Sequence, residues 1–131
     1  HSRKIAKNIL TAWTQRRIHN TLDLAKTISQ AVGGYSGKHP ATRTFHAFRI
    51  IVNQELKILE RTMADIGSYI KPGGRVAVIS YHSLEDRIVK KSLFESGAFK
   101  VITRKPVVPK HEEVKENPRA RSAKLRVAER I

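Results

Sequence analysis

Cysteine is absent from this sequence of 131 residues. The chain therefore offers no disulfide and no thiolate metal ligand, which suits a reducing compartment, and we expect a cytoplasmic protein. No apolar run approaches the roughly 20 residues that a membrane-spanning helix needs, so no membrane partner is expected. The basic N-terminus is not followed by the apolar core and cleavage site of a signal peptide.

Acidic residues are scarce: 11 Asp and Glu stand against 26 Lys and Arg, which gives a formal charge of +15. Such an excess favours an anionic partner, most commonly nucleic acid, over a basic surface that is merely solvated. Hydrophobic residues make up 40% of the chain, so a folded protein is expected. The chain begins with His1 rather than Met, which suggests a piece of a longer protein.

Hydrophobic periodicity predicts a helical N-terminal half. An apolar stripe that ends in Trp13 predicts an amphipathic helix over roughly 3–17, and Asn20 is placed to cap a second helix. Apolar residues then step by three and four from Phe45 to Ile70. This pattern predicts one long helix or two abutting ones, with the stripe in the core.

Strands and helices alternate in the second half. Residues 76–79 are apolar without alternation, as in a strand buried on both faces. Ser83 is predicted to cap the next helix, and residues 99–103 form another strand. The alternating pattern at 125–131 is typical of a half-exposed strand. Strand, helix and strand within about 30 residues predict a βαβ unit, a parallel sheet and hence an α/β fold.

Polar side chains gather just after the first of these strands, where ligands bind in open α/β sheets; they are Ser80, His82, Ser83, Glu85, Asp86 and Arg87. A structural interpretation is that Ser83 caps the helix while Glu85 and Asp86 complement its N-terminal dipole. A serine-hydrolase site is not indicated, because the turn lacks the glycines of G-x-S-x-G.

Two other kinds of site are not indicated by the sequence either. The histidines include no pair four residues apart and no H-E-x-x-H motif, so no metal site is expected at His39, His46, His82 or His111. The glycines of the predicted loop GGYSGKHP follow a helix rather than a strand, which argues against a nucleotide-binding loop.

Three stretches together resemble one family. VISYHSLEDRIVKK, HPATRTFHAFRIIVNQEL and NPRARSAKLRVAER are similar, in this order, to signature segments of the MraW/RsmH methyltransferases. The resemblance covers essentially the whole chain. It implies an S-adenosylmethionine-dependent enzyme that methylates N4 of a cytosine in small-subunit ribosomal RNA.

The resemblance also implies an arrangement of the chain. Residues 75–80, 99–104 and 124–131 would be the fifth, sixth and antiparallel seventh strands of a class I (Rossmann-like) methyltransferase sheet. Residues 1–38 would belong to a helical insertion domain for substrate recognition, and residues 39–131 to the C-terminal half of the methyltransferase domain. The family's glycine-rich cofactor loop and acidic ribose ligand have no counterpart here, so the S-adenosylmethionine site is expected upstream and the chain alone is expected to be inactive.

Residue chemistry suggests roles at two places. Ser80, His82 and Glu85 can hydrogen-bond a base edge at a strand end, and we expect them to border the acceptor pocket. The phosphates of the RNA are expected to contact four basic side chains: Arg43, Arg119, Arg121 and Lys124. Because the strand at 75–80 would lack a neighbour, association of the chain, for instance as a homodimer, is also expected.

Two alternatives to an enzyme remain open at this point. The chain would act as a non-catalytic basic RNA-binding module if its helical portion bound RNA without any reaction. It would be an interaction fragment if the amphipathic helices docked on another chain.

Overall fold

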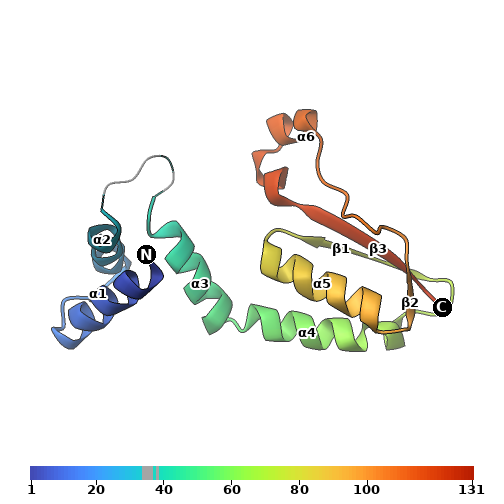
Figure 1. Ribbon diagram of the computed structural model, residues 1–131, viewed down its shortest axis with the longest axis horizontal. Coiled ribbons are helices and arrows are strands. Elements are labelled where there is room, and N and C mark those ends of the chain that lie inside the picture. Colours follow the sequence, from blue (N-terminus) through green and yellow to red (C-terminus); the bar gives the residue numbers. More distant parts are fainter. Residues whose placement is uncertain (34–36, 38) are drawn as a thin grey trace. The chain divides into compact units, whose positions relative to one another are not determined.

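The chain folds into two compact units, His1–Asn53 and Gln54–Ile131 (Figure 1). The structure, a computed structural model, describes residues 1–33, 37 and 39–131. We call the first part the helical unit and the second the sheet unit. The predicted functional boundary after residue 38 falls inside the helical unit and stays a prediction. No helix in the described parts of the chain is long and apolar enough to cross a membrane.

The helical unit consists of α1 (Ser2–Thr14), α2 (Thr21–Val32) and α3 (Thr42–Val52). α1 packs against α2 through buried small and aliphatic residues, namely Ala12, Ile28 and Ala31. Asn20 caps α2 as predicted, because its side-chain oxygen accepts the N–H groups of Leu22 and Asp23 at 2.9 and 3.0 Å. Residues 34–36 and 38 of the predicted loop GGYSGKHP lie outside the described residues.

Trp13 departs from the predicted apolar stripe of α1. Its side chain is 67% exposed, whereas its neighbour Ala12 is 2% exposed and faces α2. Successive residues of an α-helix point about 100° apart, so only one of these two can face the partner helix. Ala12 takes the position that faces α2, and the indole of Trp13 is left exposed to solvent.

The periodic stretch from Phe45 to Ile70 forms two abutting helices, one of the two predicted outcomes. α3 ends at Val52, and α4 (Glu55–Asp65) follows, continued by the short 3-10 helix η1 (Ile66–Tyr69). The break lies at Gln54, whose φ of 52° is left-handed and incompatible with a continuous right-handed helix. The prediction that the whole stripe is core is wrong, because Val52 is 77% exposed while Met63 is 5% exposed.

The sheet unit contains three strands in the order β1–β3–β2, with α5 (Ser83–Glu95) connecting β1 to β2. β3 (Lys124–Arg130) lies between β1 (Arg75–Ser80) and β2 (Phe99–Val101) and is antiparallel to both. The mixed α/β class is therefore confirmed. A directly paired parallel βαβ unit is not formed, because β3 separates the strands that α5 connects.

One face of this sheet is covered. α5 packs on it and α4 packs against α5 (Figure 1), and the two helices form a core with residues from all three strands: Met63, Val76, Val89, Leu93, Phe99 and Ala128. The prediction that β1 is buried on both faces is wrong, since Val76 and Ser80 are buried but Ala77 and Ile79 are exposed. The four-residue apolar run thus includes residues on a face that this chain leaves bare.

The buried face of the last strand carries an arginine. Arg126 and Ala128 are buried, at 5% and 0% exposure, whereas Leu125 and Val127 are only half-buried. Between β2 and β3, the chain contains the short helix α6 (His111–Glu116) and the 3-10 helix η2 (Pro118–Ser122), which pack together. Figure 1 shows both beyond the end of the sheet.

Candidate functional site at the end of strand β1

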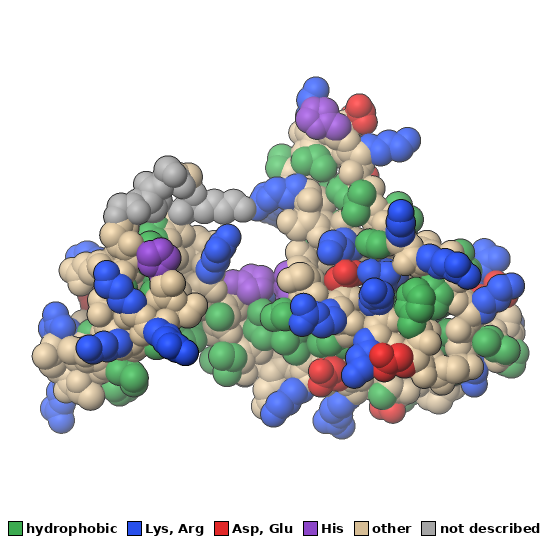
Figure 2. Space-filling model, in the orientation of Figure 1, with side chains coloured by type: hydrophobic (Ala, Val, Ile, Leu, Met, Phe, Trp, Pro, Cys, Tyr) green, Lys and Arg blue, Asp and Glu red, His purple; other side chains and the backbone are tan. Residues whose placement is uncertain are grey.

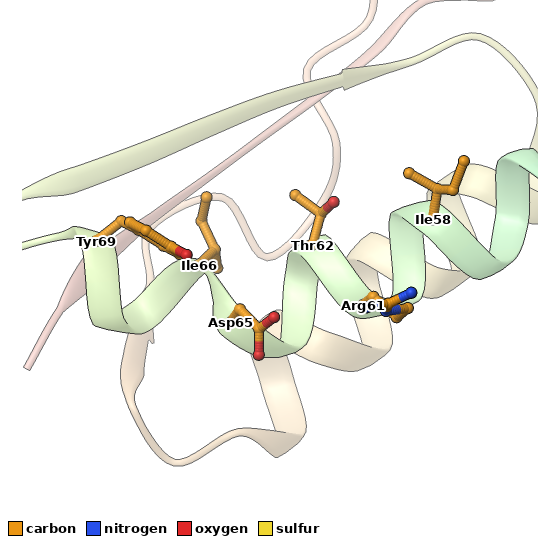
Figure 3. A pocket seen from close by; sticks show the side chains of 6 residues that line it. All are labelled: Ile58, Arg61, Thr62, Asp65, Ile66 and Tyr69. Atoms are coloured by element: carbon orange, nitrogen blue, oxygen red, sulfur yellow. The ribbon is translucent and has the colours of Figure 1, made fainter.

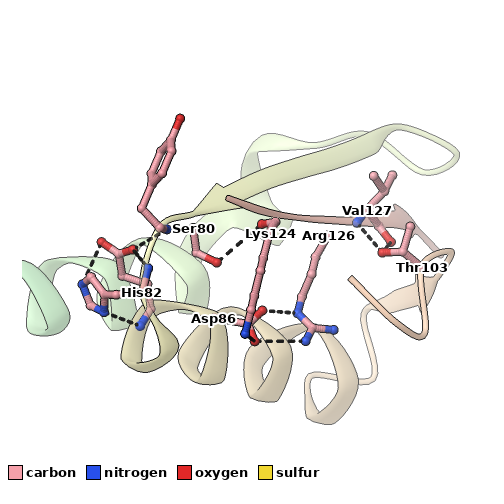
Figure 4. A network of polar contacts seen from close by, with 9 residues as sticks. Ser80, His82, Asp86, Thr103, Lys124, Arg126 and Val127 are labelled. Atoms are coloured by element: carbon pink, nitrogen blue, oxygen red, sulfur yellow. Dashed lines mark hydrogen bonds and ion pairs between the residues drawn. The ribbon is translucent and has the colours of Figure 1, made fainter. Parts of the chain in front are cut away.

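His82 is the capping residue of helix α5. Its Nδ1 atom accepts the backbone N–H of Glu85 at 3.4 Å, and Glu85 Oε2 accepts the N–H groups of His82 and Tyr81 at 3.3 and 2.9 Å (Figure 4). This reciprocal arrangement is a capping box. The prediction that Ser83 caps the helix is wrong, because Ser83 is the first residue inside the helix.

Glu55 of α4 joins this turn, which brings a third polar side chain to the site. One side-chain atom each of Glu55, His82 and Glu85 lie within 4.8 Å of one another, and the three residues are half-buried. His82 Nε2 lies 3.1 Å from Glu85 Oε1. Because Nδ1 accepts the N–H of Glu85, the proton of a neutral His82 ring resides on Nε2. A metal ion at Nε2 would displace that proton, so the cluster is better suited to hydrogen bonding than to metal binding.

Asp86, one residue further along α5, fastens the helix to β3. Its carboxylate accepts hydrogen bonds from Arg126 Nε at 2.7 Å and Nη2 at 3.3 Å, and from Lys124 Nζ at 3.3 Å. Arg126 Nη1 is buried without a hydrogen-bond partner in the described chain. Chiefly through the hydrogen bond from Arg126, and despite the opposing effect of burial, the pKa of Asp86 is held below its ordinary value.

Ser80 lies beneath the capping box at the last position of β1. It is 4% exposed, it is paired with Lys124 in the sheet register, and its hydroxyl donates to the Lys124 carbonyl at 3.5 Å. The structure therefore gathers all three predicted acceptor-pocket residues at one strand end. His82 and Glu85 remain partly open to solvent, with side chains 16% and 25% exposed, whereas Ser80 faces inward.

The four predicted RNA contacts fall into both units. Arg119 and Arg121 are exposed on η2, where Arg121 Nη1 donates to the Pro118 carbonyl at 3.2 Å. Lys124 is partly committed to Asp86. Arg43 belongs to the helical unit, where it is exposed in the first turn of α3. It borders a pocket of about 660 Å³ that apolar side chains of α1 and α3 line.

Sequence reasoning missed the partner of Asp86. The spacing of Asp86, Val89 and Leu93 puts the acidic residue on the core-facing side of α5, and all three are buried. A buried carboxylate needs a cationic or hydrogen-bonding partner, and that need was the available signal. The alternation at 125–131 could not identify Arg126 as this partner, because the pattern fits either face of the strand equally well.

A shallow pocket of about 350 Å³ runs along α4 and η1 (Figure 3). Its lining combines an apolar stripe with one cation and one anion, namely Ile58, Arg61, Thr62, Asp65, Ile66 and Tyr69. Tyr69 is 82% exposed there. None of the residues that the sequence predicted for catalysis or RNA binding lines this pocket.

Comparison with known proteins gives a consistent result over the whole chain. Residues 1–131 match the MraW methylase family. Proteins named "Ribosomal RNA small subunit methyltransferase H" are similar to it: 46% identical over 134 residues in Acaryochloris marina, 48% over 133 in Nostoc punctiforme, and 49% over 133 in Synechococcus elongatus. Each comparison covers 99% of this chain but only 44% of the relative. The chain spans less than half the length of these relatives, and it belongs to the MraW methylase family.

Proposed function

We propose that this chain is the C-terminal part of an enzyme that transfers a methyl group from S-adenosylmethionine to N4 of a cytosine in small-subunit ribosomal RNA. The observation that carries the proposal is the similarity, along 99% of the chain, to proteins named as methyltransferases of that RNA. The strand order β1–β3–β2 supports it, because β3 occupies the place expected of the antiparallel seventh strand in the family's class I sheet. We place the enzyme in the cytoplasm.

The proposed reaction is mainly a problem of positioning. The exocyclic amine of cytosine is a weak nucleophile, because its lone pair is delocalised into the ring. The amine must therefore be held in line with the methyl carbon, and the target base must leave its stack to reach a pocket. A group that accepts an N–H hydrogen bond from the amine would raise the electron density on its nitrogen.

His82 and Glu85 are placed to border that acceptor pocket, with Ser80 supporting the strand end beneath them. The capping box fixes the turn without using up the partly exposed surfaces of the two side chains. The carboxylate of Glu85 can accept a hydrogen bond, and the fixed turn presents it at the carboxyl end of β1. We propose these residues as the acceptor side of the site and assign no individual proton-transfer role.

The residues present do not complete a cofactor site. A class I sheet holds its cofactor with a tight glycine turn between a strand and a helix. In the described sheet unit, the only tight turn that leads from a strand directly into a helix runs from Ser80 to Ser83. This turn contains no glycine. The left-handed glycines of this unit, Gly73 and Gly97, precede β1 and follow α5 instead. We therefore propose that S-adenosylmethionine is bound by another part of the enzyme.

The other half of the proposed site binds RNA through charge. Arg119, Arg121 and Lys124 form a basic segment that leads into β3, and Arg43 adds a cation in the helical unit. Lys and Arg side chains spread over the visible surface of both units (Figure 2). The chain's charge of +15 supports this role and equally supports the second candidate, a non-catalytic RNA-binding module.

A chimera tests the reaction. This chain would replace the matching 44% of the Synechococcus elongatus relative, and tritium transfer from S-adenosylmethionine to unmethylated small ribosomal subunits would be measured. We expect the chimera to methylate N4 of a cytosine and the 131-residue chain alone to bind RNA without transfer. A folded chimera that binds S-adenosylmethionine yet methylates nothing would favour the non-catalytic module. Transfer by the chain alone would refute the proposed location of the cofactor site.

The same chimera tests the acceptor residues. The triple variant Ser80→Ala, His82→Ala, Glu85→Ala should lose turnover while the chimera still binds S-adenosylmethionine. Lys90→Ala, on the exposed side of α5, is the matched control and should leave turnover intact. Unchanged turnover and RNA affinity in the triple variant would remove these residues from the site.

A further inference from the structure

The helical unit carries a strong excess of positive charge. Its 53 residues contain nine Lys or Arg and a single acidic residue, Asp23. The basic positions are Arg3, Lys4, Lys7, Arg16, Arg17, Lys26, Lys38, Arg43 and Arg49. An acidic or nucleic-acid surface complements this charge, whereas an apolar or basic partner does not.

A pocket lies at the turn between α1 and α2 of this unit. It has a volume of about 520 Å³ and is lined by Trp13, Thr14, Arg16, Ile18 and His19. Trp13 is the only tryptophan of the chain and is 67% exposed. A large aromatic ring open to solvent beside cationic side chains is the combination that proteins use to stack single-stranded nucleic acid.

The backbone at this pocket is strained. The N–H of Arg16 donates to the Trp13 carbonyl, and the N–H of Arg17 donates to the Ala12 carbonyl, both at 2.9 Å. These two bonds form a Schellman motif at the end of α1, in which glycine usually occupies the left-handed position. Here that position is Arg16, with a φ of 52°. A residue with a Cβ atom costs stability in this conformation, and such strain is often retained where the side chain serves a function.

We propose that Trp13 and Arg16 form a binding site for an unpaired base of RNA. The indole of Trp13 stacks on the base, and the guanidinium of Arg16 contacts the adjoining phosphate. This inference rests on the proposed RNA substrate and adds a recognition site outside the acceptor turn. Because the single tryptophan is itself the stacking surface, its fluorescence reports directly on occupancy.

The test is a titration of the 131-residue chain with a short single-stranded oligocytidine, followed by tryptophan fluorescence. Stacking should quench the signal in a saturable way, whereas inorganic polyphosphate, which has charge but no bases, should bind without quenching. Trp13→Ala should raise the dissociation constant for oligocytidine about 5- to 150-fold, and Trp13→Phe should recover most of the affinity. Affinities of the variants would be measured by anisotropy of labelled RNA.

Two controls separate stacking from folding. Leu10→Ala removes a side chain that is 65% exposed on the same helix, and its RNA affinity should be unchanged. Arg16→Gly should raise the melting temperature, since glycine relieves the left-handed strain, and yet lower the salt slope of RNA binding by about 0.7. Arg17→Gly, next to it but outside the pocket lining, should not raise the melting temperature.

The outcomes distinguish this inference from the proposed function. RNA binding that leaves tryptophan fluorescence unchanged, or that tolerates Trp13→Ala, overturns the stacking site and leaves the RNA substrate standing. Equal quenching by polyphosphate overturns base recognition, and equal quenching by polyglutamate points to an acidic protein partner instead. Failure of the wild-type chain to bind any RNA overturns the proposed substrate and this site together.

Discussion

Replacing Asp86 by asparagine removes one charge from the buried cluster that joins α5 to β3. Arg126, which is 5% exposed, would keep its charge and lose its ionic partner. The asparagine side chain has nearly the same shape and retains one oxygen that can accept a hydrogen bond. The substitution therefore tests the charge of Asp86 rather than its volume.

The expected loss can be estimated from the geometry. Removing one partner of a buried, hydrogen-bonded ion pair costs about 3–5 kcal/mol, because the other charge stays buried and uncompensated. The contact with Lys124 adds little to this figure, since the Lys124 side chain is 37% exposed and screened by solvent. With the retained hydrogen bond, we expect about 3 kcal/mol, or a melting temperature about 12–24 °C lower for a unit of this size.

Urea unfolding followed by circular dichroism measures this loss. Glu95→Gln is a matched control, because its pair with Lys91 on the same helix is exposed and 3.9 Å long, and it should change stability by less than about 1 kcal/mol. The double variant Asp86→Asn, Arg126→Met should recover most of the lost stability, since it leaves no buried unpaired charge. If Asp86→Asn costs less than about 0.5 kcal/mol, or if the double variant is no better, the reasoning is refuted.

Four further outcomes are expected. The pKa of folded Asp86 lies below its unfolded value of about 3.9, so the stability that this residue contributes at neutral pH should disappear as the pH falls below about 4. In urea unfolding measured from pH 6 to 2, Asp86→Asn should therefore lose less stability on acidification than the unmodified chain. Parallel curves for the two proteins would contradict this. His82→Ala should cost about 1 kcal/mol in the same unfolding assay, and His82→Asn should restore it; equal losses would exclude the capping role. Replacing both Arg119 and Arg121 by alanine should lower the salt slope of RNA binding by about 1.4, and an unchanged slope would remove them from the interface. Ile79→Lys should reduce self-association in sedimentation experiments, since Ile79 is 55% exposed on the bare face of β1; a wild-type chain that stays monomeric would contradict this.

Patterns that depend on neighbours along the chain were predicted well. The cap at Asn20, the strands predicted at 76–79 and 125–131 and a helix beginning near Ser83 all follow from local periodicity and turn chemistry. The resemblance to the MraW/RsmH family added the antiparallel last strand, which periodicity alone does not specify. Both kinds of inference concern which elements form, and they were confirmed.

Which side of an element is buried was predicted less well. The apolar run of β1 was interpreted as buried on both faces, although a short apolar run also fits a strand whose second face awaits another part of the fold. The alternation in β3 did not specify which face of the strand is buried, and the face toward α5 carries Arg126 because Asp86 compensates its charge there. Which face of a strand is buried depends on contacts between residues about 40 positions apart, and a single sequence does not reveal these contacts.

The polar stretch at the end of β1 thus divides its residues between two tasks. His82 and Glu85 close the first turn of α5 and leave part of their side chains at the strand end, whereas Asp86 points the other way and holds β3 in place. Since Ser80 is paired with Lys124 in the same register, any shift of β3 would move the base of the turn as well. Loss of Asp86 should therefore disturb the acceptor side of the proposed site indirectly, through strand position. In the active enzyme, Asp86→Asn should then raise the RNA concentration needed for half-maximal rate, and Arg126→Met in the same chain should partly restore it.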